Sequence, residues 1–146
     1  MTTEKQRISI KFAMSIDDDG EKEYNVVKAV GSYYKKERFD VITYKEALDD
    51  DVFVNNLLTI HKNKVSIKRT GAVQMNQQFD QQRMTESVYQ HPHGNFHMET
   101  VTEAIHYERP TEQSAGRLSI DYNVRLNGQE KRKHSLLLTF QEENKA

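Results

Sequence analysis

The sequence predicts an all-β fold, an antiparallel up-and-down β-barrel of eight to nine strands. Residues 7–16 and residues 117–126 each place five apolar side chains at alternate positions, which is the period of a strand with one buried face. The pair Asn127-Gly128 follows the second segment and suits a type I′ hairpin turn, because both central positions of that turn need positive φ. The other connections are short and polar, so no crossover helix can join parallel strands.

The remaining strands follow in chain order between turn-forming residues. The first strand ends at an acidic turn, residues 17–20, and a second acidic turn follows at residues 49–51. Runs rich in Val, Ile and aromatic residues between such turns predict further strands at residues 24–30, 39–44, 52–60, 65–69, 82–90, 96–107 and 131–140. Residues 72–81 are rich in Gln and Asn, and they are compatible with a loop, a bulged strand or one helical turn.

Chain length and hydropathy fit one closed sheet. The 146 residues suffice for a single domain over residues 1–146, with flexible ends expected at 1–6 and 142–146. A hydrophobic content of 36% suits strands that have one solvent-facing side. A long open meander would leave two exposed edges, whereas a barrel removes them. A two-sheet sandwich also fits the strand count, but the succession of short turns favours the barrel.

The composition argues against several functional classes. The chain has 21 basic and 22 acidic residues, a balance that argues against nucleic-acid or anionic-membrane partners. It has no cysteine, which excludes disulfides, thiolate nucleophiles and cysteine–zinc sites. The N-terminal residues do not match a secretory leader and the apolar runs are short, so we expect a cytoplasmic protein. Phosphate-binding, dinucleotide-binding and nucleophile-elbow motifs do not occur in it, and we expect neither a cofactor nor an enzyme activity.

One segment of the sequence is distinctive enough to indicate a family. It is KRTGAVQMNQQF at residues 68–79, and weaker matches are DDDG at 17–20, GSYY at 31–34 and GRLSIDY at 116–122. Through these segments the chain resembles the DUF1934 family of small bacterial proteins, over most of its length. The resemblance implies a lipocalin-like (calycin) β-barrel, but it supplies no catalytic residue, because the family is uncharacterised. A barrel of this kind hosts binders, enzymes and scaffolds, so the fold alone does not decide the function.

The histidines of one predicted turn offer a weak metal-binding pattern. His91, His93 and His97 form H-x-H-x-x-x-H, and alternate residues of a strand share a face. Pro92 and Gly94 instead place the first two histidines in a turn. A zinc site also usually needs a fourth ligand. We therefore expect these residues to be a solvated turn, with no bound metal.

Arg69 and Gly71 are the residues expected to be structurally constrained. Gly71 ends a predicted strand and can supply a bend there, because glycine tolerates positive φ. If Arg69 points into the barrel, its guanidinium needs an acidic partner or an anionic ligand, since an unpaired buried charge is very unfavourable. Two hypotheses follow: Arg69 closes one end of the barrel by bonding to carbonyls or a carboxylate, or it anchors a ligand.

The barrel interior is expected along the strand at residues 96–107. One face of this strand begins with the bulky Phe96 and Met98 and continues with the small or mildly polar Thr100, Thr102 and Ala104. A wall of this kind can leave a cavity. Alternation of large and small residues can equally fill a barrel without any void. The opposite face of the strand carries residues such as Val101 and Ile105, so the sequence leaves the inward face open.

Two functional hypotheses follow from these observations. The leading one is a non-enzymatic protein that binds a small anionic or apolar ligand in its interior or mouth, through Arg69, Met98, Thr100 and Thr102. The alternative is an interaction module with a solid core, which includes a homodimer, with interface tyrosines drawn from Tyr33, Tyr34, Tyr44 and Tyr89. An internal void below roughly 100 Å³ would exclude the ligand-binding hypothesis, because ligand pockets are several-fold larger.

Overall fold

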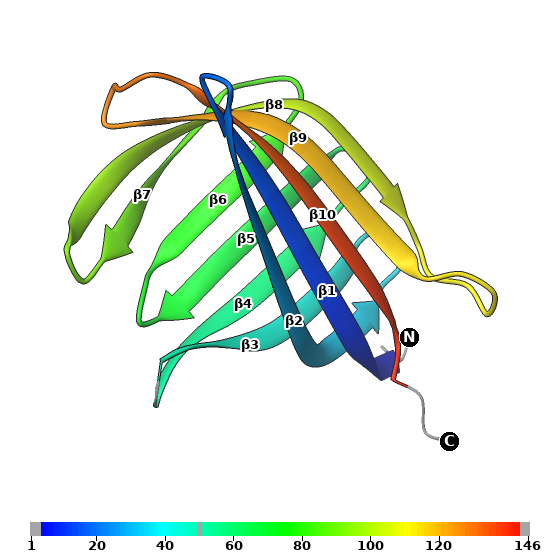
Figure 1. Cartoon of the computed structure of the whole chain (residues 1–146). Helices are drawn as coiled ribbons and strands as arrows, with labels where there is room; N and C mark the ends of the chain where they lie inside the picture. The colour runs from blue at the N-terminus through cyan, green and yellow to red at the C-terminus, as the bar shows by residue number, and fades with distance from the viewer. Residues whose placement is uncertain (1–3, 50, 144–146) are drawn as a thin grey trace.

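The structure, a computed structural model, describes residues 4–49 and 51–143 and arranges them in ten antiparallel strands (Figure 1). The strands are β1 (Glu4–Asp18), β2 (Glu21–Lys35), β3 (Asp40–Asp49), β4 (Val52–Ile60), β5 (Lys64–Gly71), β6 (Met75–Asp80), β7 (Thr85–His91), β8 (Gly94–Glu108), β9 (Gly116–Leu126) and β10 (Arg132–Glu142). Across these residues there is no helix with the length and apolar character needed to cross a membrane.

All ten strands belong to one sheet. Their order is β6-β5-β4-β3-β2-β1-β10-β9-β8-β7, so successive strands are neighbours except β6 and β7, which are the two edges. The chain's first strand pairs with its last, β1 with β10. The predicted antiparallel up-and-down barrel is confirmed. The predicted strand count of eight to nine is slightly low, because the Gln- and Asn-rich segment contains an additional strand, β6.

The sheet curls until its two edges meet, which makes a nearly closed barrel. At one end Gln74 and Gln90 exchange two backbone hydrogen bonds, of 2.9 and 2.7 Å. Farther along the seam the hydroxyl of Thr85 donates to the carbonyl of Gln78 at 2.5 Å. These contacts satisfy part of the hydrogen-bonding potential that two free edges would otherwise expose.

The strands extend closer to the chain ends than expected. Glu4 already pairs with Lys35 of β2, and Glu142 pairs with Ile8. Residues 4–6 and 142 therefore belong to the sheet, although they were predicted as parts of flexible ends. The predicted flexible residues 1–3 and 144–146 lie outside the described residues.

A glycine and a turn shape two hairpins. Gly71 has φ +108°, and a Cβ there would lie 2.7 Å from the carbonyl oxygen of Phe53, so β5 bends where other residues would be strained. Asn127 and Gly128 both have positive φ, at 49° and 72°. The connection is longer than a two-residue hairpin, because β10 begins only at Arg132.

A β-bulge explains why the inward face of β8 could not be predicted. The pairing of β8 with β9 shifts register between Thr102 and Ala104. Before the shift Met98, Thr100 and Thr102 are buried, and after it Ile105 is buried instead. Both faces named in the sequence therefore point inward in turn, since one inserted residue reverses the alternation.

One end of the barrel is closed by a buried carboxylate. Asp40 is fully buried and accepts hydrogen bonds from Tyr33 at 2.9 Å and Tyr107 at 2.6 Å. Arg109 binds the same carboxylate through Nε and Nη2, both at 3.0 Å. Burial raises the pKa of Tyr33 to about 12 and raises that of Tyr107 as well. Tyr33 and Tyr44, both named as interface candidates, are buried, so they cannot form an outer interface.

Candidate functional site

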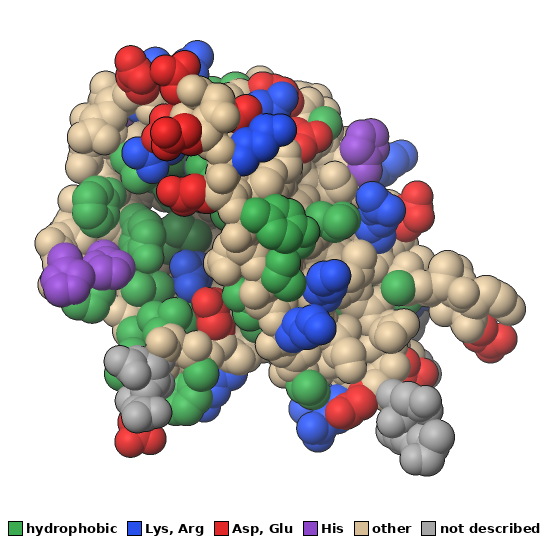
Figure 2. All heavy atoms as spheres, viewed as in Figure 1, with side chains coloured by type: hydrophobic (Ala, Val, Ile, Leu, Met, Phe, Trp, Pro, Cys, Tyr) green, Lys and Arg blue, Asp and Glu red, His purple; other side chains and the backbone are tan. Residues whose placement is uncertain are grey.

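The barrel wall divides between β2 and β3. These strands pair only where Gly31–Lys35 lie opposite Asp40–Tyr44, and residues 21–30 of β2 pair with β1 alone. At the branching point a Cβ on Gly31 would lie 2.2 Å from the carbonyl oxygen of Thr43, so only glycine allows this close approach. Beyond it the two strands diverge (Figure 1), and on the same face the space-filling view has an opening into the barrel (Figure 2).

A cavity of about 190 Å³ lies inside the barrel at the end opposite the Asp40 cluster. Figure 2 shows a hollow on this face of the molecule, bordered by hydrophobic side chains and holding basic and acidic ones. The apolar part of the cavity wall consists of Phe12, Met14, Val27, Ile67, Met75 and Leu136. The polar part consists of Asn25, Tyr44, Glu46, Asn56, Arg69, Gln77 and Tyr122.

Arg69, Glu46 and Asn56 form a hydrogen-bonded group on the cavity wall. Arg69 Nη2 lies 3.2 Å from Glu46 Oε1, and Arg69 Nε donates to Asn56 Oδ1 at 3.2 Å. Asn56 Nδ2 donates in turn to Glu46 Oε1 at 3.5 Å. The inward guanidinium therefore has the carboxylate partner that one of the two hypotheses for Arg69 requires. It does not need an anionic ligand for charge balance.

The other predicted binding residues lie behind the wall rather than on it. Gln77 lines the cavity and donates through Nε2 to the hydroxyl of Thr100 at 3.0 Å, with both side chains buried. Met98 and Thr102 are buried in the core, and the cavity wall defined above includes neither. Of the four predicted binding residues, the structure places Arg69 on the wall and brings Thr100 into contact with it through Gln77.

Tyr122 places a poorly satisfied hydroxyl at the cavity. Its side chain is 2% exposed and lines the wall, and its hydroxyl contacts Met14 Sδ at 3.9 Å. A thioether is a weak acceptor, so this buried donor lacks a strong partner among the described residues. Burial raises the pKa of Tyr122, and that of Tyr44 is raised to about 12 by burial and by Glu46, against the effect of Arg69. Both phenols thus keep their protons at neutral pH.

Sequence reasoning missed most of the polar wall for identifiable reasons. The third strand was expected to end at residue 44, whereas β3 continues to Asp49. Within the longer strand Asp40, Tyr44 and Glu46 occupy alternate positions, so all three side chains lie on the inner face. Gln77 lies in the segment that the sequence left undecided. Tyr122 was placed correctly within a period-two strand, but as an apolar core residue.

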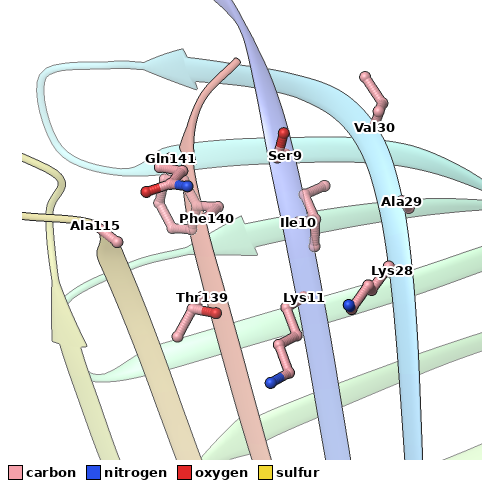
Figure 3. A pocket seen from close by; sticks show the side chains of 10 residues that line it. All are labelled: Ser9, Ile10, Lys11, Lys28, Ala29, Val30, Ala115, Thr139, Phe140 and Gln141. Carbon is pink, nitrogen blue, oxygen red and sulfur yellow. The ribbon is translucent and has the colours of Figure 1, made fainter. Parts of the chain in front are cut away.

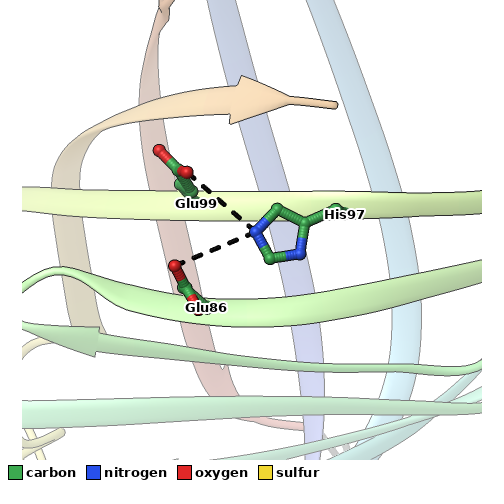
Figure 4. A group of neighbouring side chains, drawn as sticks. All are labelled: Glu86, His97 and Glu99. Atoms are coloured by element: carbon green, nitrogen blue, oxygen red, sulfur yellow. Dashed lines mark ion pairs between the residues drawn. The ribbon is translucent and has the colours of Figure 1, made fainter. Parts of the chain in front are cut away.

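The histidine pattern does not form one site. The ring centroids of His91 and His93 lie 5.1 Å apart, and the backbone N–H of His93 donates to His91 Nδ1. His97 instead lies between two carboxylates, with its Nε2 3.9 Å from Glu86 and 4.0 Å from Glu99 (Figure 4). The three histidines are therefore divided between the β7–β8 turn and the outer face of β8.

A wider hollow of about 680 Å³ lies on the outer wall, over β2, β1 and β10 (Figure 3). Lys11 and Lys28 face each other directly across β1 and β2 there, between short side chains such as Ser9 and Thr139. The interior cavity is smaller but better enclosed, and it contains the paired charges and the buried phenol, so it is the stronger candidate site.

Comparison with known proteins supports the fold at the level of the whole chain. The sequence matches the domain of unknown function DUF1934 over residues 8–138. It is 28% identical over 134 residues to the uncharacterized beta-barrel protein YwiB of Bacillus subtilis (strain 168), covering 92% of each chain. The structure is similar to the crystal structure of the ywiB protein from Bacillus subtilis, with a TM-score of 0.84 and 26% identity, over 97% of this chain and 96% of that one.

Proposed function

This chain belongs to the DUF1934 family, and we propose that it binds a small molecule inside its barrel without catalysing a reaction. The observation that supports the proposal is the interior cavity of about 190 Å³. An apolar cavity of about 150 Å³ can hold benzene, so this one has room for a ligand with a single ring or a short chain. It is smaller than the pockets that hold drug-sized ligands.

The opening between β2 and β3 gives such a ligand a route to the cavity. Asn25 and Val27 of β2 lie on one side of the cavity wall, and Glu46 of β3 lies on the other. No strand pairs with residues 21–30 of β2 on the side facing β3, within the described part of the chain. A ligand can therefore enter without separating any paired strands.

A fluorine NMR screen with single-ring fragments tests the proposal. We expect several fragments to bind, and their binding to be lost in Val27→Trp, whose indole would fill the cavity. The matched control is Val26→Trp, because Val26 is the next residue and points outward. The proposal fails if no fragment binds, or if both variants reduce binding equally.

The unpaired edge of β2 favours a second candidate function, self-association. Tyr24 is 72% exposed, and Val26 and Val30 are exposed as well. This is an unusually large apolar surface for an unpaired edge strand. Antiparallel pairing of two copies about Val26 would place Tyr24 of one copy opposite Lys28 of the other, a favourable cation–π contact. Light scattering should then show a dimer that Val26→Asp dissociates. The control Val101→Asp, at another exposed valine, should leave the dimer intact.

A further inference from the structure

We infer that the cavity selects uncharged ligands whose polar group both donates and accepts hydrogen bonds, of the kind found in a carboxamide on a single ring. The inference rests on the proposed function and specifies its ligand. It follows from three properties of the wall: its charge balance, its free hydrogen-bonding groups and its size.

The wall is electrically neutral. Among its residues only Arg69 and Glu46 carry charge at neutral pH, and they are 3.2 Å apart. Their side chains are 22% and 19% exposed, so water screens them only in part. A charged ligand would lose hydration on entering and would find no unpaired countercharge, which is unfavourable. The wall therefore disfavours carboxylates and cations alike.

The same wall presents donors and acceptors together. The contacts made by the described residues occupy Nε and Nη2 of Arg69 and Oε1 of Glu46, which leaves Arg69 Nη1 as a donor and Glu46 Oε2 as an acceptor. The hydroxyl of Tyr122, held only against a thioether, is a further donor that a carbonyl oxygen would satisfy. A carbonyl next to an N–H matches this arrangement, whereas a purely apolar ligand would leave these groups unsatisfied.

The apolar half of the wall determines which nonpolar group of a ligand fits the cavity. Phe12, Met14 and Met75 belong to it, and methionine adapts to irregular shapes and packs well against aromatic rings. With about 190 Å³ available, one six-membered ring and its polar group fill the space. Benzamide, benzoate, benzamidine and toluene are then matched probes, because they share one ring and differ in the charge and polarity of the substituent.

Titration calorimetry of the full chain with the four probes at pH 7 tests the inference. We expect benzamide to bind at least about tenfold more tightly than each of the other three. Benzoate and benzamidine lose hydration without gaining an unpaired countercharge, and toluene leaves the polar groups of the wall unsatisfied. The site is checked by loss of benzamide binding in Val27→Trp and not in Val26→Trp. Equal or tighter binding of benzoate, benzamidine or toluene would overturn the inference.

Two charge-removing variants sharpen the test. Glu46→Gln leaves Arg69 unpaired, so the preference should move to benzoate, and Arg69→Gln leaves Glu46 unpaired, so it should move to benzamidine. Lys68→Gln, which removes an exposed charge from the neighbouring position of β5, should leave the preference for benzamide unchanged. Preferences that do not move in the first two variants would contradict the role given to the ion pair.

The double variant Glu46→Gln/Arg69→Gln keeps the test decisive if either single variant folds poorly. Its wall is again neutral, so benzamide should remain the preferred probe, and a preference for a charged probe would count against the inference. If fluorine-screen fragments bind in a Val27→Trp-sensitive manner while benzamide does not, only this inference fails. If no fragment binds at all, the proposed function fails with it.

Discussion

At the scale of single residues, His134 shows how burial on the inner face controls protonation. Its ring stacks on Tyr122 with centroids 5.1 Å apart, and its Nδ1 is buried without a hydrogen-bond partner among the described residues. Burial, and to a lesser degree the charge of Arg132, lowers the pKa of His134 from 6.5 to about 4. The folded protein therefore holds this imidazole neutral in a pH range where the unfolded chain protonates it.

This difference predicts a pH-dependent stability. Because the folded-state pKa is the lower one, the unfolded chain binds more protons between pH 6.5 and about 4, and the free energy of unfolding falls as the pH drops through that window. We expect a loss of about 2 kcal/mol there, after allowing for partial solvent screening. Urea titrations of His134→Phe should show a flatter profile between these pH values.

The exposed His106 provides the control. His106→Gln should retain the wild-type pH profile, because it leaves the buried imidazole of His134 unchanged. A profile that is unchanged in His134→Phe and altered in His106→Gln would show that another group is responsible for the acid sensitivity.

At the scale of elements, strands in which apolar and polar residues alternate regularly were predicted more completely than strands in which they do not. β1 and β9 keep strict period-two patterns, and the inward residues from Leu118 to Val124 are buried as expected. β8 was ambiguous because its bulge reverses the pattern after Thr102. β6 was undecided because its residues are mostly polar, with Gln77 buried through a hydrogen bond rather than through hydrophobicity.

The candidate site was predictable only in part, because its residues come from several strands whose register the sequence does not show. Arg69 could be singled out because an inward arginine needs a partner. Its partners could not be named, because Glu46 and Asn56 lie 23 and 13 residues away along the chain and meet Arg69 only through the register of β3, β4 and β5. Strand register depends on long-range packing, and the sequence of one strand does not contain it.

The bulge in β8 leads to a prediction for that element. Deleting Glu103 would restore uninterrupted pairing with β9 and leave Thr102, Ile105 and Tyr107 all facing inward, because the bulge holds one residue more than the partner strand. Deleting Val101 from the regular part of β8 would instead turn Glu103 inward or Ile105 outward. We therefore expect the Val101 deletion to lower the free energy of unfolding by more than about 3 kcal/mol, and the Glu103 deletion to lower it by much less. Comparable losses in urea titrations of the two deletion variants would contradict the role given to the bulge.

At the scale of the whole molecule, the barrel divides into a closed end and an open end. The closed end holds the Asp40 cluster and the fully buried Phe140, whose ring lies 5.1 Å from that of Tyr33 between centroids. The open end holds the cavity and the divergence of β2 from β3. The Asp40 cluster therefore closes one end of the barrel, whereas the other end keeps unfilled space.

Hydrogen exchange should report this division. Amides of residues 21–30 of β2 have a paired strand on one side only, whereas Gly31–Lys35 are paired on both sides. We expect the first group to exchange faster, apart from amides bonded to β1, because exchange follows local opening. Mass spectrometry of exchanged peptides measures the difference. Equal protection along β2 would indicate that the opening is covered in solution.

The pairing of β1 with β10 has a consequence for how the protein is made. During synthesis β1 precedes the other nine strands of the sheet, yet its neighbour β10 follows all of them, so one edge of β1 stays unpaired until the other strands have been made. Such distant pairing slows folding and prolongs the life of unpaired edges. Before Arg132 is added, β1–β6 and β7–β9 are linked only by the few seam contacts around Gln74 and Gln90, among the described residues, and β10 then pairs with both β1 and β9 and makes them one sheet.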